Sequence, residues 1–487
     1  MVRRFCTPLL LALSACSQPA EDEAVQVALV GAPEELAQDG LRLSNPAQRL
    51  RAATAQGLVR LDANGEVVPG IAQSWIVTDD GLSYIFRLRD IEWPDGTPVT
   101  AQQVRRQLLR TIRELRGTTL GLDLLKIAEV RAMTGRVIEI QLASPQAQFL
   151  RVLAQPELGL LRGGEGLGPM QRLAAEDGVI ALAAIPPQER GLPEEPDWRE
   201  TVQPLRVTAM PAERAIAAFE NGSLDVVLDG GLATLPLVDA GPLARGTVRV
   251  EAAIGLFGFD VTAAQGFLAD AANREAVALA IDRATLLEPF NLAGWTPATR
   301  IVPPDLPGNP RQNAERWTDL DLAARQEVAR ERVQTWRAAN GELPPLRIAL
   351  PAGPGSDILF RQVADDLAAV GLPAVRVGAA EPADLALRDR VARYGQARWF
   401  LNQFNCRVAE DLCAPEADEL VERATDTLDA ATRAALLAQA EDVLTARNLF
   451  IPLGAPIRWS LVRGGIDGFT ENPWAVHPLF PLTNAPI

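Results

Sequence analysis

The sequence predicts a mixed α/β protein with more than one domain, and three observations support this prediction. Its 487 residues are too many for one hydrophobic core, and the length favours two or three domains. Apolar residues make up 48% of the chain, which is ample for burial. Segments with strand character, such as 25–30, 205–209 and 346–350, alternate with segments of helical character, such as 213–219 and 358–370.

The N-terminus is typical of an export signal. Arg3 and Arg4 precede an apolar run from Phe5 to Leu13, which is too short to span a bilayer. We therefore expect residues 1–15 to be a signal peptide. The sequence Leu13-Ser14-Ala15-Cys16 is similar to a lipobox, so Cys16 would carry the lipid and residues 16–23 would form a tether. The alternative is an ordinary cleaved signal with an incidental cysteine.

Charge and cysteine content restrict the class of partner and the compartment. With 62 acidic and 47 basic residues the formal charge is −15, which argues against binding nucleic acid. Once Cys6 leaves with the signal and Cys16 is lipidated, Cys406 and Cys413 remain. In an oxidising periplasm they could form a disulfide worth roughly 2 kcal/mol, or they could stay as separate thiols. His477 is the one histidine, so a zinc site is not expected.

Segment 57–115 predicts a strand-rich module that ends in a helix. Asn64-Gly65 and Asp80-Gly81 are turn pairs between short apolar runs, which predicts two β-hairpins in series. In the strand that follows, Tyr84, Phe86 and Leu88 fall on one face. A helix is then predicted from the capping box Thr100 and Gln103 and from apolar residues at helical spacing, namely Val104, Leu108, Ile112 and Leu115.

The ordered motifs of this module, from Gly57 through Asp95-Gly96-Thr97-Pro98-Val99-Thr100, resemble the signature region of the bacterial extracellular solute-binding proteins of family 5. These are the peptide- and nickel-type receptors of ABC importers. Further segments resemble later parts of the family pattern in the same order, namely 214–227, 273–283 and 434–447 with the following Phe450-Ile451-Pro452-Leu453. The resemblance therefore extends over most of the chain.

The resemblance implies a bilobal periplasmic-binding-protein fold, type II and cluster C-like, with an extra inserted α+β subdomain. The expected lobe I combines residues 24–43, 160–258 and 461–487, the inserted subdomain is 44–159, and lobe II is 259–460. Chain crossings near Gly258 and Ser460 would form a hinge, at which a few residues absorb the change as the lobes close.

In the family, ligand binds between the lobes, and segment 398–411 resembles the second-lobe region that supplies contacts. The resemblance implies that Asp411 receives a ligand ammonium, Arg407 a carboxylate, and Trp399 a flat apolar surface. Asn402 and Asn405 would satisfy main-chain groups of the ligand. The alternatives are solvated or locally paired charges and, for Trp399, packing in a core.

Enzyme motifs are incomplete, so no catalytic residue, cofactor or metal is expected. Gly353–Asp357 lacks the final glycine of a nucleophile elbow, and Gly163–Gly168 fits neither a dinucleotide fingerprint nor a phosphate loop.

Two departures from the family pattern concern the ligand: Gly166–Met170 lacks the usual tyrosine, and Pro33–Leu36 lacks the usual Leu-Asp-Pro. A smaller or different solute is therefore compatible with the sequence.

The expected function is that of a monomeric, periplasmic, membrane-anchored substrate-binding lipoprotein. It would capture a short peptide or similar small polar solute and deliver it to a permease of the inner membrane with ATPase subunits. One alternative is a sensing or interaction module without transport, and a remote alternative is a periplasmic hydrolase. Ser17 after Cys16 favours outer-membrane sorting, which conflicts with delivery to an inner-membrane permease, so the choice of membrane stays open.

Overall fold

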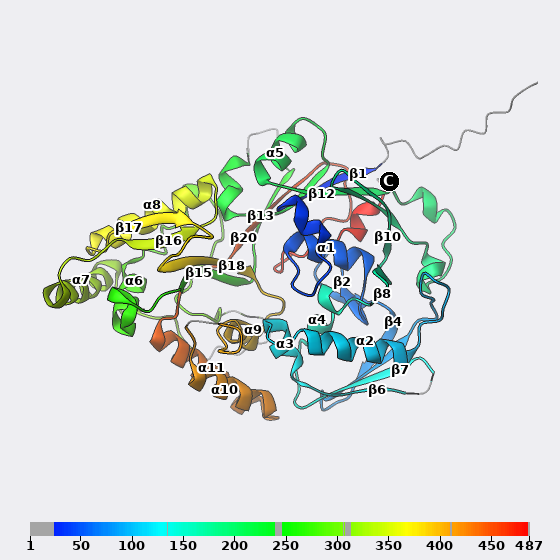
Figure 1. Cartoon of the computed structure of the whole chain (residues 1–487), viewed down its shortest axis with the longest axis horizontal. Helices are drawn as coiled ribbons and strands as arrows, with labels where there is room; N and C mark the ends of the chain where they lie inside the picture. Colours follow the sequence, from blue (N-terminus) through cyan, green and yellow to red (C-terminus); the bar gives the residue numbers. More distant parts are fainter. Residues whose placement is uncertain are drawn as a thin grey trace, which may run out of the picture.

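Two large β-sheets organise the chain, and a smaller sheet is inserted near the N-terminus (Figure 1). The computed structural model describes residues 24–133, 135–238, 246–304, 306, 313–409 and 412–485. The predicted signal peptide 1–15 and the tether 16–23 with Cys16 lie outside the described residues, as does Asp411. Within the described part, no helix combines the length and the apolar character that crossing a membrane requires.

The larger sheet has seven strands, and the part of the molecule built on it is called lobe I below. In spatial order its strands are β10 (Met170–Glu176), β11 (Val179–Ala184), β12 (Leu205–Met210), β1 (Val25–Val30), β13 (Val226–Gly231), β20 (Ile457–Val462) and β14 (Val248–Ala252). β1 runs parallel to both neighbours, which helix α5 (Ala212–Glu220) connects. Ala28 packs in one hydrophobic cluster and Val27 and Leu29 in another, so this strand is buried on both faces.

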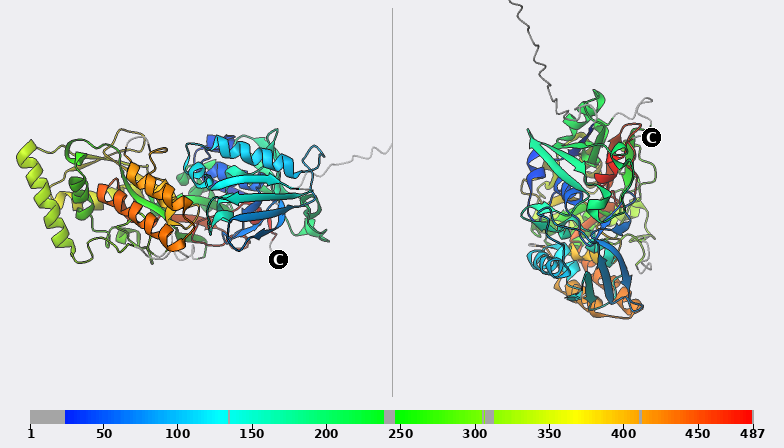
Figure 2. Two further views of the ribbon diagram at one scale, coloured as in Figure 1. Left: turned by 90° about the horizontal axis from the view of Figure 1, so that it is seen from below. Right: turned by 90° about the vertical axis from the view of Figure 1, so that its right-hand side faces the viewer.

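The second sheet has five strands, and the part built on it is called lobe II. In spatial order its strands are β17 (Ala374–Gly378), β16 (Leu346–Leu350), β18 (Leu385–Val391), β15 (Gly255–Val261) and β19 (Phe450–Gly454). Its helices are α6 (Ala271–Ala280), α7 (Leu322–Asn340), α8 (Pro354–Ala369), α9 (Ala397–Asn402), α10 (Pro415–Asp426) and α11 (Ala430–Arg447). Seen from below, the two lobes follow each other along the long axis of the molecule (Figure 2).

The chain passes between the two large sheets at two neighbouring places. The first connection, 253–254, joins β14 to β15, and the second, 455–456, joins β19 to β20. The amide of Ala253 donates a hydrogen bond of 2.8 Å to the carbonyl of Pro456, so the connections contact each other. The positions near Gly258 and Ser460 at which crossings were predicted lie a few residues after these connections, inside β15 and β20. The three-part residue division stays a prediction.

The inserted subdomain precedes β10 in the chain. Its helices are α1 (Asn45–Thr54), α2 (Ala101–Glu114), α3 (Thr119–Leu124) and α4 (Phe149–Leu153). Its strands are β2 (Val59–Leu61), β3 (Val67–Pro69), β4 (Ala72–Val77), β5 (Ser83–Leu88), β6 (Ile127–Ala132) and β7 (Val137–Leu142), followed by the short pair β8 (Leu161–Arg162) and β9 (Glu165–Gly166). The four strands β4-β5-β7-β6 form one sheet, and β2 pairs with β3.

The local predictions for this subdomain are confirmed. Asn64-Gly65 joins β2 to β3 and Asp80-Gly81 joins β4 to β5, with both glycines at positive φ. The side chains of Tyr84, Phe86 and Leu88 are buried on one face of β5. Both bonds of the predicted capping box before α2 are present.

The inserted subdomain also packs against lobe II, where helix α3 contacts helix α9. A hydrophobic cluster extends from Phe86 in the subdomain to Phe400 in lobe II. Asp123 of α3 is fully buried in this interface and accepts hydrogen bonds of 2.7 Å each from the Tyr394 hydroxyl and the Asn402 amide. Burial raises the pKa of Asp123 to about 6, although the charge of nearby Arg398 opposes the rise.

Gly230 is required at the packing contact between β13 and β20. A Cβ atom at this position would lie 2.0 Å from Cε2 of the buried Trp459 indole. We expect Gly230→Ala to lower the free energy of unfolding by about 1–3 kcal/mol, as overpacking does, in urea titrations. Gly464→Ala is the matched control, since its Cβ would meet no heavy atom within 4 Å. Equal stability of the two variants would contradict this packing contact.

Asp123 predicts a dependence of stability on pH. Its pKa is about 3.9 in an unfolded chain and about 6 when folded, so the folded state binds the proton more tightly between these values. Stability therefore falls as pH rises from about 4 to 6, by up to about 3 kcal/mol from this group. Asp123→Asn is expected to remove this fall in stability between pH 4 and 6, as measured by melting curves recorded at several pH values in this range. The exposed control Asp319→Asn should keep it, and an unchanged pH profile in Asp123→Asn would refute the assignment.

Candidate ligand-binding cleft

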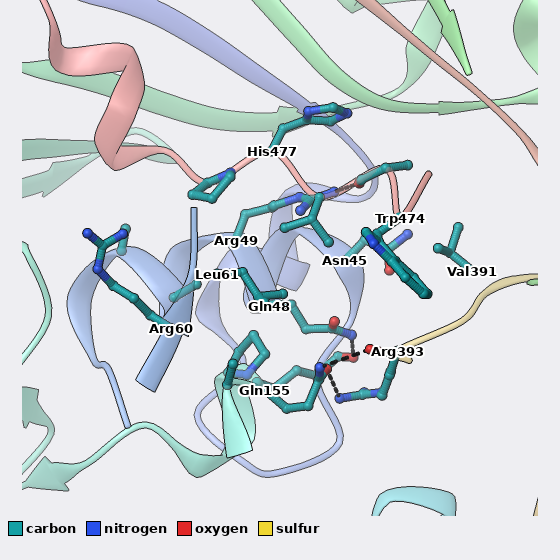
Figure 3. A pocket seen from close by; sticks show the side chains of 18 of the residues that line it. Asn45, Gln48, Arg49, Arg60, Leu61, Gln155, Val391, Arg393, Trp474 and His477 are labelled. Carbon is teal, nitrogen blue, oxygen red and sulfur yellow. Dashed lines mark hydrogen bonds between the residues drawn. The ribbon is translucent and has the colours of Figure 1, made fainter. Parts of the chain in front are cut away.

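A cavity of about 290 Å³ lies where the two lobes and the inserted subdomain meet (Figure 3). Lobe I contributes β13, β20 and the C-terminal segment 474–480, and lobe II contributes the end of β18 with the residues that follow it. The inserted subdomain contributes α1 and β2. The charged residues on the cavity wall are Arg49, Arg60, Asp229, Asp389, Arg390, Arg393 and Arg458. A solute in this cavity would contact all three parts at once.

A bulge in β13 turns Asp229 towards helix α1. The pairing of β13 with β20 is irregular between Val227 and Gly230, and Asp229 has the left-handed backbone conformation with φ of 68°. Its carboxylate accepts a hydrogen bond of 2.6 Å from Nη2 of Arg49, which also bonds the Ala475 carbonyl at 2.8 Å. The Arg49–Asp229 pair holds the lobe I wall of the cavity in place. A residue other than glycine with positive φ, such as Asp229, is strained, and such residues are common at binding sites.

Arg393 joins lobe II to the inserted subdomain through a fork-shaped ion pair. Its two terminal nitrogens donate hydrogen bonds of 2.7 Å each to the carboxylate oxygens of Glu157, whose side chain is 2% exposed. Gln155 accepts a further bond of 3.1 Å (Figure 3). Burial acts to raise the pKa of Glu157, but the charge and hydrogen bonds of Arg393 keep it below its usual value. Glu157 is therefore an anion at neutral pH.

A second ion pair joins the two sheets beside the chain crossings. Arg458 on β20 donates a hydrogen bond of 2.7 Å to Asp389 on β18. The two strands belong to different lobes, so this ion pair joins the lobes next to the crossings. Side chains as well as the two connections therefore join the lobes in this structure.

Arg390 and Arg60 are the cavity arginines that form no ion pair among the described residues. Nη1 of Arg390 donates a hydrogen bond of 2.7 Å to Gln403. Surrounding protein displaces water from the guanidinium and, together with the charges of Arg393 and Arg388, lowers the pKa of Arg390 to about 10. Burial likewise lowers the pKa of Arg60, and Asp62 opposes the change.

The one histidine of the sequence is part of this wall. His477 is 4% exposed, and its Nε2 lies 2.8 Å from a carboxylate oxygen of Glu251. Its ring stacks on Phe469, with the ring centroids 4.4 Å apart. The structure thus places the one histidine buried beside the cavity.

Of the described residues that the sequence predicted to bind ligand, none lines this cavity. Trp399 is 1% exposed and packs edge-on against Phe400, and Asn402 bonds Asp123 in the subdomain interface. Asn405 is buried and accepts a hydrogen bond of 3.0 Å from the backbone amide of Arg407, which is exposed. Their role in ligand binding stays a prediction, and that of Asp411 concerns a residue outside the described part.

The segment that does line the cavity, 389–393, lies shortly before the predicted one. Sequence reasoning missed it because its alternating charges resemble the exposed face of a strand. The sequence feature that could have identified it is the group Arg388-Asp389-Arg390 with Arg393, which follows the apolar start of β18 directly. No sequence pattern predicts the pair Arg49 and Asp229, because 180 residues separate the two in the chain.

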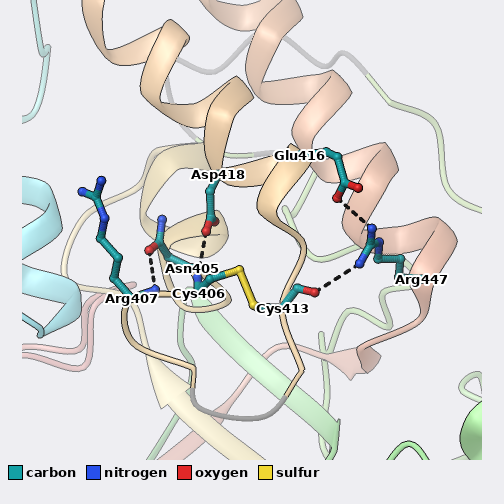
Figure 4. Close-up of a disulfide and its surroundings, with 7 residues drawn as sticks. All are labelled: Asn405, Cys406, Arg407, Cys413, Glu416, Asp418 and Arg447. Atoms are coloured by element: carbon teal, nitrogen blue, oxygen red, sulfur yellow. Dashed lines mark hydrogen bonds and ion pairs between the residues drawn. A yellow bond between two sulfur atoms is a disulfide. The ribbon is translucent and has the colours of Figure 1, made fainter.

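Cys406 and Cys413 form a disulfide in lobe II, with their Cα atoms 5.1 Å apart (Figure 4). The amide of Cys406 donates a hydrogen bond of 2.9 Å to Asp418 on α10, and the carbonyl of Cys413 accepts one of 3.3 Å from Arg447 on α11. The disulfide therefore anchors the loop after α9 to this helix pair and does not reach the cavity wall. In the described part of the chain, no group of three or more His, Cys, Asp or Glu side chains could hold a metal ion.

Comparisons with known proteins agree with this architecture. The chain is 22% identical over 466 residues to the probable deoxycholate-binding periplasmic protein YgiS of Escherichia coli, covering 86% of this chain and 85% of the relative. It is 26% identical over 367 residues to the nickel-binding periplasmic protein of Escherichia coli, covering 69% of this chain and 68% of the relative.

Solved structures show the same fold. OppA of Haemophilus influenzae, solved in complex with the peptide RPPGFSPFR, superposes with a TM-score of 0.79 at 19% identity, covering 96% of this chain and 99% of that one. The murein tripeptide binding protein MppA of Escherichia coli gives a TM-score of 0.75 at 18% identity, covering 95% of this chain and 98% of that one. The predicted bilobal periplasmic-binding-protein fold is confirmed.

A sequence model of the middle region of one family matches residues 66–378, which is well over half of the chain. The match includes most of the inserted subdomain and continues through β16 and β17 of lobe II. The predicted family is therefore confirmed, and the chain belongs to the bacterial extracellular solute-binding proteins of family 5.

Proposed function

We propose that this protein is the substrate-binding lipoprotein of an ABC importer, which captures a short peptide or similar small polar solute and delivers it to an inner-membrane permease. The observation that carries the proposal is the cavity enclosed by both lobes and the inserted subdomain, directly beside the two chain crossings. The similar proteins named above are periplasmic binding proteins, which supports a periplasmic location.

In this proposal the ligand stabilises the closed arrangement, because it contacts both lobes only when they are together. The ion pairs Arg393–Glu157 and Arg458–Asp389 add protein contacts that form on closure. A closed monomer then presents a defined surface to the permease. The chain performs no covalent chemistry, and separate ATPase subunits supply the energy for uptake.

Ligand capture can be tested with the purified full-length protein and a library of short peptides and small polar solutes. A ligand at 100 times its Kd is expected to stabilise the fold by about 2.7 kcal/mol, visible as a rise in melting temperature. Small-angle X-ray scattering should show a smaller radius of gyration with ligand than without it. Glu157→Gln should weaken this compaction, while the exposed control Glu419→Gln should not. A protein that never shifts in either assay would favour a sensing or interaction module instead.

The lipid anchor is a separate part of the proposal and concerns Cys16. Cells grown with labelled palmitate are expected to label the protein and retain it in the membrane fraction. Cys16→Ser should lose both the label and the membrane retention, because the thiol is the acceptor of the diacylglyceryl group. Cys6→Ser is the matched control, since that residue leaves with the signal peptide. A labelled Cys16→Ser protein would refute the anchor.

A further inference from the structure

The cavity wall carries more positive than negative charge. Five arginines line it, and three of them are neutralised by the carboxylates of Asp229, Asp389 and Glu157. Arg390 and Arg60 form no ion pair with a described residue, although the charges of Glu157 and Asp260 act on Arg390 and that of Asp62 acts on Arg60. The cavity therefore holds two arginines without a direct ion pair, in a chain whose formal charge is −15.

The guanidinium of Arg390 has donors to spare. An arginine has five N–H donors, and the structure gives those of Arg390 one acceptor, the side-chain oxygen of Gln403. The backbone of β18 holds the residue in place, with Arg390 opposite Leu256 of β15. Burying a cation without a partner is unfavourable. A hydrogen-bond acceptor on a bound solute would therefore stabilise the guanidinium of Arg390.

Arg60 occupies a different part of the same wall. It extends from β2 of the inserted subdomain, and Figure 3 shows it on the other side of the pocket from Arg393. Its guanidinium carbon lies 6.0 Å from the ring centroid of Phe480, and it donates no side-chain hydrogen bond to another described residue. Lobe II and the inserted subdomain thus each present one unpaired arginine to the cavity.

The volume of the cavity limits the size of the solute. About 290 Å³ is at the lower end of the range of small-molecule sites, roughly 300–1,000 Å³. A long peptide does not fit within the closed cavity. A dipeptide or a small organic acid is of suitable size.

We propose that the ligand of this cleft is a small acidic solute whose carboxylates bind Arg390 and Arg60. Carboxylates match the planar fork of a guanidinium and form charge-assisted hydrogen bonds with it. A solute with two carboxylates bridges lobe II and the inserted subdomain and so favours closure. This inference rests on the proposed capture function and deepens it by naming the class of substrate.

The test compares matched probes by isothermal titration calorimetry on the full-length protein. The dipeptides Glu-Glu and Gln-Gln differ only in carboxylate against amide, and glutarate is a dicarboxylate without a peptide main chain. We expect at least one of the two acids to bind about 10-fold or more tightly than Gln-Gln. Binding of both acids, or of either alone, supports the inference and identifies whether an acidic peptide or a non-peptide acid is preferred.

Arg390→Gln is expected to weaken binding of the preferred acid by about 10- to 100-fold, the value of a charged hydrogen-bonding pair, and to weaken Gln-Gln, which keeps only its terminal carboxylate, by less. Arg390→Lys should retain part of the affinity, because it keeps the charge and loses the fork. The exposed Arg361→Gln on α8 is the control and should bind as the unmodified protein does. The melting temperature without ligand should not fall in Arg390→Gln, since an unpaired cation is removed.

Two results would overturn the inference and leave the capture function standing. One is that Gln-Gln binds as tightly as the acids, and the other is that Arg390→Gln weakens all bound probes equally. If the library of peptides and polar solutes also produces no shift, the capture function fails and the inference fails with it. A binding protein that prefers neutral probes is thus distinguished from a protein that captures nothing.

Discussion

The two neighbouring connections between the sheets are the constraint on which the rest of the structure depends. They bond to each other through Ala253 and Pro456, so the lobes are held at one edge and the cleft lies beside it. The Ala392 amide donates a hydrogen bond of 2.7 Å to the carbonyl of Ile254, within the first connection. The end of β18 that lines the cavity is thereby attached directly to the first connection, so a solute bound to Arg390 would act on this connection at short range.

Ion pairs join the lobes beside the cleft, in addition to the hydrophobic clusters that extend between the parts of the molecule. A buried ion pair such as Arg393–Glu157 adds little net stability, because the attraction is offset by the loss of hydration. It does require a defined geometry, since the fork of Arg393 fits the carboxylate in one orientation. In the proposed function, contacts from a bound solute would shift the balance between open and closed lobes.

The charge of the whole chain and the charge of the cavity have opposite signs. At physiological ionic strength the interactions of exposed charges are screened beyond about 8 Å. An acidic solute in the cavity therefore responds mainly to Arg390, Arg60 and the paired arginines around it, and little to the distant acidic surface. The net charge of −15 argues against nucleic acid as a partner but carries no information about the charge of the cleft.

The sequence alone determined what depends on neighbouring residues: the hairpin turns at Asn64-Gly65 and Asp80-Gly81, the buried face of β5, the capping box of Thr100, and through ordered motifs the family and its bilobal fold. Only the tertiary structure decided which residues line the candidate site. Turning α9 inward buried Trp399, and the bulge at Asp229 and the fold as a whole brought together partners such as Arg393 and Glu157, which are 236 residues apart. Turns and caps are fixed within a few residues, whereas a cleft between lobes is assembled from distant strands whose pairing no local pattern specifies.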